Sequence, residues 1–567
     1  MIWFNSKLIH KNLLFLFLLV PTLFYTGTYD PFIIKKFLAL TFIFMGSWLW
    51  IIRLLENKIP FQKPSLLIPL TLFLSSVILS AKNALYPALI FDYFLWTLAL
   101  SLLYLLSSQI NNQKFKENLF FTIALATAIS GIYGAFQHFG FDFVPWTKKW
   151  DARPGSTFGN PNFAAGWWIL TAPIFLALSL KQMQEKRSYL FFSLTALIGL
   201  LNLYWSRTKG ASLALVLSLI FGIGFYLYYV KKEKNKFLMP AYFLICILIL
   251  SGLSLWISQE WKKRMQDQSL RERIFKWETA KEIVKANPVF GVGANHLKVH
   301  FAHYQAEVKK RMRIQLISTS ESNVHNEFLQ IWAELGILGL FSFLLIFIQW
   351  FWKMIKSLNN QKEKLLENTG LLTSILSFLF YSLTNFPFHH VPTACLSFFI
   401  LGISESAINE PPLIKTEKTI SKNIFLRISG IFLFGLLFIK WILPAFKADL
   451  FRLKAENAFL SKDFETAVQF YKKAIRLDFY HSERTAYTLA ESLRAQGKIK
   501  EALEAYQISA ALRNYGEVYN NIGNCYYLLH NKNAAIENWK KAIQLGLPDE
   551  NAQKQAEENL KIIIENN

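Results

Sequence analysis

Apolar runs long enough to cross a lipid bilayer recur along this chain as far as residue 443, and they constrain the fold more than any other feature. A membrane-spanning helix needs roughly 20 predominantly apolar residues, and backbone within lipid must satisfy its own hydrogen bonds. Of the 567 residues, 53% are hydrophobic and only 17% are charged, which is unusual for a soluble protein of this length. The sequence therefore predicts an all-α, polytopic helical membrane protein with about 12 to 13 transmembrane helices.

The first apolar run follows Lys7 and Lys11 and lacks a small-residue cleavage site, so we expect it to be retained as a span. The predicted spans cover residues 12–29, 33–52, 65–81, 84–106, 119–139, 163–180, 189–205, 211–230, 237–257, 331–352, 371–386, 391–407 and 424–443.

Basic residues predict the orientation, because Lys and Arg concentrate in cytoplasmic loops. They are about twofold enriched in alternate loops, beginning with the N-terminus, which we therefore place inside. The net charge of +23 follows from these loops and does not indicate nucleic-acid binding, although some of it can hold anionic lipid head groups or a diphosphate. The longest connection, residues 258–330, then lies outside, and an odd number of spans puts everything after residue 444 outside as well.

The tail from residue 445 to 567 is polar and repetitive. Ala467, Ala502 and Ala535 align, and Tyr471, Tyr506 and Trp539 each follow four residues later. The spacings between the alanines are close to the 34-residue tetratricopeptide period. We expect about three repeats in a small α-solenoid that either binds a protein partner or is a plain stack of helical hairpins. The predicted domains are thus 1–444, in the membrane, and 445–567.

Two polar clusters lie between predicted spans on the outer side. In "RPGSTFGNPN", Arg153 precedes a Gly/Pro turn that cannot be regular helix. Asn160 and Asn162 either bond hydroxyls and shape this loop or cap the next helix. In "SRTKGAS", Arg207 and Lys209 break the positive-inside pattern, which favours phosphate binding by an arginine fork and a lysine point charge over snorkelling to lipid head groups.

A third cluster lies in the long outer loop. The sequence predicts an amphipathic helix at residues 271–286, with Arg273 and Trp277 on one face. We expect it to end at the following proline, before a turn that contains Gly291 and Gly293. His296, His300 and His303 follow at helical spacing but lack an acidic or thiol partner, so we expect a polar helix face and no metal. Three well-separated cysteines support neither a disulfide framework nor a metal cluster.

The fourth cluster is "SESNVHNEFLQIWAELGILG", where the chain re-enters the membrane. His325 is the side chain suited to proton transfer near neutral pH, or it is a capping or surface histidine. A helix that begins near Asn323 would place His325 and Gly336 on one face and Glu327 and Glu334 on the other. A direct His–Glu dyad within this helix is then not expected, and Glu334 would pair inside the bundle.

In order, "RPGSTFGNPN", "SRTKGASLAL", "RIFKWETA…NPVFGVGANHL" and "SNVHNEFLQIWAELGILG" resemble the O-antigen ligase and polymerase superfamily, with an added tetratricopeptide tail. The resemblance covers roughly residues 119–340. It implies a glycan carried on a polyprenyl diphosphate such as undecaprenyl diphosphate, and transfer to a hydroxyl outside the bacterial inner membrane, on the periplasmic side. It also implies a histidine motif at His325, Asn326 and Glu327 and arginines at Arg153, Arg207 and Arg273.

The resemblance and the residues together suggest a mechanism. Arg153, Arg207, Arg273 and Lys209 would bind the diphosphate and stabilise its charge as it leaves, while His325 accepts the proton of the acceptor hydroxyl. Asn160, Asn162 and Asn326 would contact the glycan or shape the loops. The sequence offers no acidic cluster for a divalent cation, so we expect no metal and no cofactor, and a single displacement that inverts the anomeric carbon.

The identity of the acceptor and the class of reaction stay open. Ligases of this family usually have about twelve spans and end inside, whereas the span at 424–443 delivers this tail outside. Transfer to lipid A–core, extension of a polysaccharide and transfer to a protein hydroxyl are therefore all compatible with the sequence. A transporter of lipid-linked sugars would need charges near mid-span and repeated spans, and a non-catalytic envelope scaffold would not need the arginine–histidine set.

Overall fold

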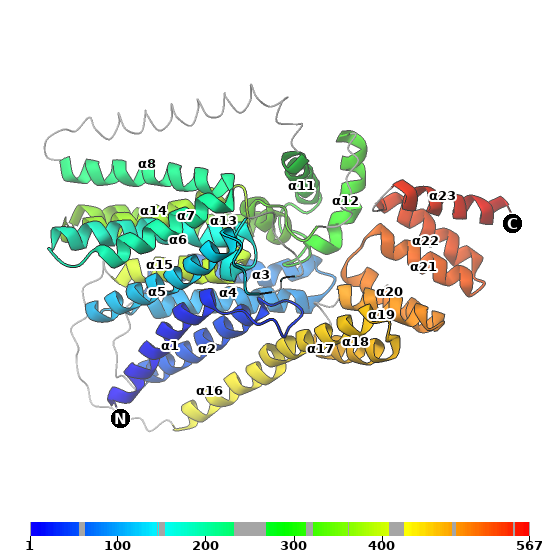
Figure 1. Ribbon diagram of the computed structural model, residues 1–567, viewed down its shortest axis with the longest axis horizontal. Coiled ribbons are helices and arrows are strands. Elements are labelled where there is room, and N and C mark those ends of the chain that lie inside the picture. Colours follow the sequence, from blue (N-terminus) through cyan, green and yellow to red (C-terminus); the bar gives the residue numbers. More distant parts are fainter. Residues whose placement is uncertain are drawn as a thin grey trace.

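The computed structural model describes residues 2–55, 63–144, 146, 153–231, 268–312, 321–360, 362–406, 424–478, 483–547 and 550–565, and these form helices without a β-strand (Figure 1). The bundle helices are α1 (Ile2–Thr22), α2 (Ile33–Leu55), α3 (Leu67–Leu79), α4 (Pro87–Ser108), α5 (Gln113–His138), α6 (Pro161–Gln184), α7 (Leu190–Ser206), α8 (Lys209–Lys231), α13 (Glu327–Asn360), α14 (Leu365–Ser382), α15 (Val391–Ser406) and α16 (Ile424–Leu437).

The predicted all-α membrane fold is confirmed. Each predicted span within the described residues coincides with a helix, and the span predicted at 237–257 lies outside those residues. By length and composition, six helices in the described part of the chain can cross a bilayer: Ile33–Leu54, Pro87–Ser108, Gln113–His138, Pro161–Gln184, Lys209–Val230 and Glu327–Leu358. The first helix begins earlier than the predicted 12–29. It also ends earlier, because Pro21 lies in its last turn and the turn that follows carries Gly27.

Helix α6 is the centre of the bundle. It packs against α7, α8, α14 and α15, and 78% of its most apolar 18-residue window is buried. Because α6 starts in the Asn160 turn, that turn is fixed to the core of the protein.

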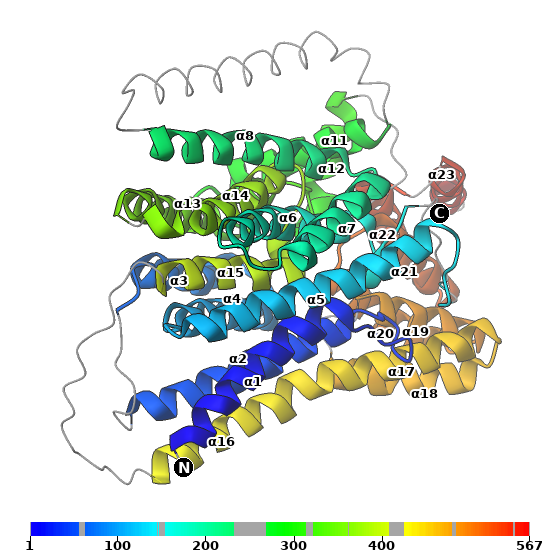
Figure 2. The same ribbon diagram turned by 60° about the vertical axis from the view of Figure 1, so that its left-hand side comes forward.

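Helices α11 (Gln268–Ala286) and α12 (Leu297–Met312) stand at one end of the bundle, and the C-terminal helices gather at the same end, away from the N-terminus (Figures 1 and 2). Helix α11 packs on α12 and on α13, which ties the outer loop to the bundle. The carboxyl ends of α5, α7 and α14 and the amino ends of α6, α13 and α15 meet at this end, where the site lies.

The tail contains three helical hairpins and a final helix, which confirms the predicted repeats. They are α17 (Leu443–Leu460) with α18 (Phe464–Leu477), α19 (Glu483–Ala495) with α20 (Ile499–Leu512), α21 (Gly516–Leu528) with α22 (Lys532–Leu545), and α23 (Glu550–Glu565). The aligned alanines are fully buried where the paired helices meet.

Each aligned aromatic residue also donates a hydrogen bond to a residue fifteen positions earlier. The hydroxyl of Tyr471 donates to Glu456 at 2.9 Å, that of Tyr506 donates to Glu491, and the indole of Trp539 donates to Asn524 at 3.0 Å. The three hairpins therefore share this hydrogen bond as well as the alanine–aromatic sequence pattern.

The proposed boundary at residue 444 falls inside continuous helix. Helix α16 passes through a π-helical turn, η5 (Phe438–Ile442), directly into α17, the first helix of the repeats (Figure 2). The last apolar helix and the tail are thus joined by a helix rather than by a flexible linker.

Candidate active site

The turn before α6 is tightly fixed. Gly159 has a φ of +76°, and the side chain of Asn160 caps α6 by accepting a hydrogen bond from the N–H of Asn162 at 2.8 Å. Asn162 does more than contribute to this cap. Its side-chain oxygen accepts from the hydroxyl of Thr208 at 3.2 Å, and its carbonyl accepts from the hydroxyl of Tyr381 at 2.8 Å. Asn162 therefore joins the α6 entrance to the α7–α8 turn and to α14.

Arg207 and Lys209 flank Thr208 in that α7–α8 turn. Arg207 ends α7 in the left-handed region, with φ of 52°, and both cationic side chains are exposed. A non-glycine residue in this region carries a conformational cost. Neither side chain has an ion-pair partner among the described residues. The turn presents two uncompensated positive charges beside the Asn162 contacts.

His325 lies just outside α13 rather than on it, which corrects the expectation of a helix starting near Asn323. The helix begins at Glu327, Asn326 caps it by accepting from the N–H of Leu329 at 3.0 Å, and His325 has a φ of 54°. The His325 ring meets the ring of Phe386 edge to face at 5.0 Å, and its Nδ1 is buried without a hydrogen-bond partner. The prediction that His325 forms no dyad with the glutamates of this helix agrees with this geometry.

Arg273 and Lys276 of α11 act on His325. Burial, followed by the positive charges of Lys276 and Arg273, lowers the pKa of His325 to about 3. Lys276 pairs with Glu321 at 3.0 Å, whereas Arg273 has no ion-pair partner among the described residues. The site therefore holds a neutral imidazole beside a guanidinium that no carboxylate of the described residues pairs with.

No hydrogen bond or ion pair in the described part of the chain joins Arg153 to the other site residues. It lies three residues before Ser156, whose N–H donates to Gln137 at 2.7 Å and whose hydroxyl donates to the carbonyl of Ser130 at 2.5 Å. These bonds hold the start of the turn against α5. Arg153 is half-buried and has no ion-pair partner among the described residues.

Helix α13 is interrupted at Gly336, and the glycine turn of the outer loop bonds to its backbone there. Gly336 has φ of 69° and ψ of −170° inside the helix. The N–H of Ile337 donates to Pro288 at 2.9 Å and the N–H of Gly293 donates to Glu334 at 2.9 Å. A Cβ on Gly336 would overlap the carbonyl oxygen of Val289, so two predicted motifs are joined through their backbones.

Glu334 is buried, but it pairs toward the outer loop rather than within the bundle as expected. Its side chain accepts from the N–H of Leu297 at 3.2 Å and so caps α12. His296 is also held by the backbone, with Nδ1 2.7 Å from the carbonyl of Ala294 and Nε2 accepting from the N–H of Tyr86 at 3.0 Å. Its role in the structure is to join α12 to α4.

The turn between α14 and α15 completes the site, and sequence reasoning missed it. Glu327, fully buried, accepts from the N–H of Phe388 at 2.9 Å, lies 3.0 Å from Nδ1 of His389, and donates its own N–H to the carbonyl of Asn385 at 3.1 Å. Asn385 also bonds the hydroxyl of Tyr381. Two adjacent histidines at the outer end of a predicted span were the available signal.

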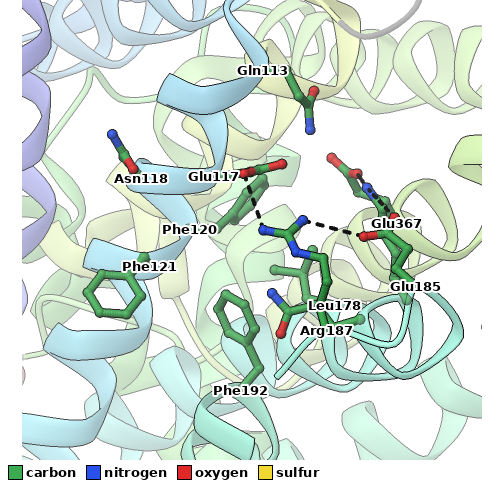
Figure 3. Close-up of a pocket in the computed structure, with 12 residues that line it drawn as sticks. Gln113, Glu117, Asn118, Phe120, Phe121, Leu178, Glu185, Arg187, Phe192 and Glu367 are labelled. Carbon is green, nitrogen blue, oxygen red and sulfur yellow. Dashed lines mark hydrogen bonds and ion pairs between the residues drawn. The ribbon is translucent and has the colours of Figure 1, made fainter. Parts of the chain in front are cut away.

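A separate pocket of about 220 Å³ lies at the opposite end of the same helices (Figure 3). It is formed by the start of α5, the end of α6 and the starts of α7 and α14. Its cations are already paired: Lys181 lies 3.0 Å from Glu367, and Arg187 lies 3.4 Å from Glu185 and 3.7 Å from Glu117. This pocket belongs to a network that holds helix ends together, and it is remote from His325.

Comparison with known proteins supports the predicted resemblance. Residues 194–344 match the family described as O-Antigen ligase, and residues 516–545, which form α21 and α22, match the family described as Tetratricopeptide repeat. An "Uncharacterized protein" of Haemophilus influenzae (strain ATCC 51907 / DSM 11121 / KW20 / Rd) is 24% identical over 286 residues, which cover 47% of this chain and 67% of that protein.

The O-Antigen ligase match includes the turn of Arg207, the helix of Arg273 and the α13 entrance at His325. These segments are far apart in sequence but lie at one end of the bundle. The chain is therefore a multi-pass helical membrane protein in which residues 194–344 match the O-Antigen ligase family and residues 516–545, in the tail, match the Tetratricopeptide repeat family.

Proposed function

We propose that the protein transfers a glycan from a polyprenyl-diphosphate carrier to an acceptor hydroxyl, as an O-antigen ligase-like glycosyltransferase. The observation that carries this proposal is the half-buried, neutral His325 beside Arg273, at the end of the bundle where Arg207 and Lys209 also have no ion-pair partner among the described residues. Cations without carboxylate partners among the described residues are suited to an anionic ligand. The O-antigen ligase match over these segments supports the same function.

The cations would act on the leaving group. The bond between the anomeric carbon and the phosphate oxygen breaks, and its electron pair leaves with the diphosphate. Arg207, Arg273, Lys209 and Arg153 stabilise the charge that develops, which preorganised positive groups do most effectively where water is excluded. Asn160, Asn162 and Asn326 shape the turns on which these groups stand. The proposed mechanism uses no metal and inverts the anomeric carbon.

His325 would accept the proton of the acceptor hydroxyl as the new C–O bond forms. Burial, followed by the positive charges of Lys276 and Arg273, lowers the pKa of His325 to about 3, so its imidazole is a weak base. Binding of an anionic diphosphate to Arg273 offsets that positive charge and raises the basicity of His325. Donor binding therefore activates the base, so that proton transfer is coupled to an occupied site.

We infer that the domain at 1–444 lies in the bacterial inner membrane with the site on the periplasmic side, and that the domain at 445–567 lies on that side too. The basic inner loops and the position of α11, α12 and the repeats at one end support this orientation. The acceptor is a glycolipid such as lipid A–core, a growing glycan or a protein, and the repeats bind a protein partner.

Alanine variants of His325 and Arg207 in cells test the function. We expect both to remain abundant in membranes, to lose the surface glycan on gels and by mass spectrometry, and to accumulate lipid-linked glycan. Arg187→Ala is the matched control, because Arg187 is a half-exposed arginine at the other end of the same helices.

Unchanged surface glycan in both abundant variants would contradict the proposal. Loss of glycan without accumulated lipid-linked donor would contradict it as well, because a blocked transfer step leaves its donor unused. The attachment point of the wild-type product distinguishes a ligase from a polymerase or a protein transferase.

A further inference from the structure

Three histidines surround one phenylalanine ring in the site. The ring of Phe386 lies 5.0 Å from that of His325, 4.9 Å from that of His390 and 6.2 Å from that of His389. Only His325 has a part in the proposed transfer. Of the other two, His390 is buried and His389 is half-buried with buried ring nitrogens, and such titratable groups at the end of a membrane bundle call for a reason.

His390 is the least explained of the three. Only 6% of the residue is exposed, and neither ring nitrogen has a hydrogen-bond partner among the described residues. The ring of Phe163 lies 3.6 Å away, which puts His390 beside the Asn160–Asn162 turn. Buried polar atoms without protein partners are where ordered water is bound. A neutral imidazole with two available nitrogens can accept a proton on one and release it from the other.

His325 and His389 lie in surroundings of opposite charge. His325 faces Arg273 and Lys276 from α11, whereas His389 faces Glu327 and Glu334 from α13. The remaining charged or titratable neighbours are Lys36 of α2, Tyr93 of α4 and His390 between the two.

These charges favour proton movement in one direction. Burial disfavours a charged His389, but the carboxylates of Glu327 and Glu334 outweigh this and raise the pKa of His389. Burial and the two neighbouring histidines lower the pKa of His390. A proton released at His325 is therefore more stable at His389.

We propose that His325, His390 and His389 form a proton relay that ends at the pair of His389 and Glu327, with water between the rings. This inference rests on the proposed glycan transfer. The acceptor O–H bond breaks and its proton goes to His325, while the diphosphate leaves with the electron pair of the broken C–O bond. The proton then passes through His390 to His389, whose Nδ1 lies 3.0 Å from Glu327. The His389 side chain is 19% exposed but both ring nitrogens are buried, so a bound water carries the proton from there to solvent.

The relay gives His389 a role that depends on pH. It must be neutral to receive a proton, so turnover falls as pH falls through the pKa of His389. Replacing Glu327 by glutamine keeps an acceptor for the Phe388 N–H but removes the charge that raises this pKa. The acid limb of the pH–rate profile should then move to lower pH, which a purely structural role for Glu327 would not produce.

The test measures turnover of lipid-linked glycan against pH in membranes that contain the full-length protein. We expect His390→Phe, which keeps an aromatic ring beside Phe163, to lower maximal turnover about tenfold or more with an unchanged KM and a larger solvent deuterium isotope effect. We expect Glu327→Gln to shift the acid limb downward. His138→Phe is the matched control, since His138 stacks on Trp205 at the same end of the bundle.

Wild-type turnover in His390→Phe, or an unmoved acid limb in Glu327→Gln, would overturn the relay. If one variant fails to reach the membrane, the other still decides. Should His325→Ala also turn over donor normally, the proposed function fails; should His325→Ala alone be inactive, the relay fails and the function stands.

Discussion

Gly336 permits the closest approach in the site. Its positive φ and the carbonyl of Val289 against its Cα explain why α13 breaks there and why the outer loop can bond to residues 333–337. The sequence predicted close packing at this glycine, but it could not reveal the break, because the partner segment lies more than forty residues earlier.

Gly336→Ala should therefore destabilise the protein. A φ of 69° with a ψ of −170° is a backbone conformation that is essentially restricted to glycine and costs another residue about 1–3 kcal/mol, and overlap with Val289 adds to that. Thermal unfolding in detergent, monitored by intrinsic fluorescence, should show a lower Tm. Gly435→Ala is the control: nothing lies within 4 Å of an added Cβ at this helical glycine, so its Tm should be unchanged or higher. A wild-type Tm for Gly336→Ala would contradict the geometry.

The asparagines show how far sequence reasoning reaches for single residues. For Asn160 and Asn162 it left capping and function open, and the structure assigns the α6 cap to Asn160 while Asn162 links three elements. Asn326 caps α13. Residue types and their order indicated that these asparagines matter. The hydrogen bonds that distinguish the capping asparagines from the linking one involve residues from distant parts of the chain.

At the scale of elements, helices were predictable and the turns between them only partly so. Apolar runs and the alanine–aromatic spacing indicated the spans and repeats, because both are local patterns. The turn at 385–390 escaped because its meaning depends on Glu327, about sixty residues earlier. His389 acquires its acidic surroundings only when α13 and α14 come together, and sequence proximity alone does not indicate that.

At the scale of the whole molecule, the repeats are attached to the outer loop and to the α1–α2 turn. Lys298 of α12 lies 3.2 Å from Glu483 of α19, Gln305 donates to the carbonyl of Leu545 at 3.5 Å, and the N–H of Asp30 donates to Asp449 at 2.8 Å. Since α12 packs on α11, which carries Arg273, the tail supports the site as well as any partner.

Reversing one charge at this joint should loosen it. The side chains of Lys298 and Glu483 are 13% and 18% exposed, so Lys298→Glu should cost about 1–2 kcal/mol, between the values for exposed and buried pairs. Hydrogen exchange of α12 and the first turn of α19 should become roughly tenfold faster. The double variant Lys298→Glu/Glu483→Lys should recover protection, and equal protection in all three proteins would mean that the pair does not hold the joint.

The most direct test of the central claim is release of polyprenyl diphosphate by the purified full-length protein, with EDTA present, from a labelled lipid-linked glycan and its acceptor. We expect release and glycan transfer by the wild type, and a rate lower by roughly 10²–10⁴-fold in folded His325→Ala, the range expected for loss of a general base. Release by His325→Ala at the wild-type rate would contradict the role of His325 as the base.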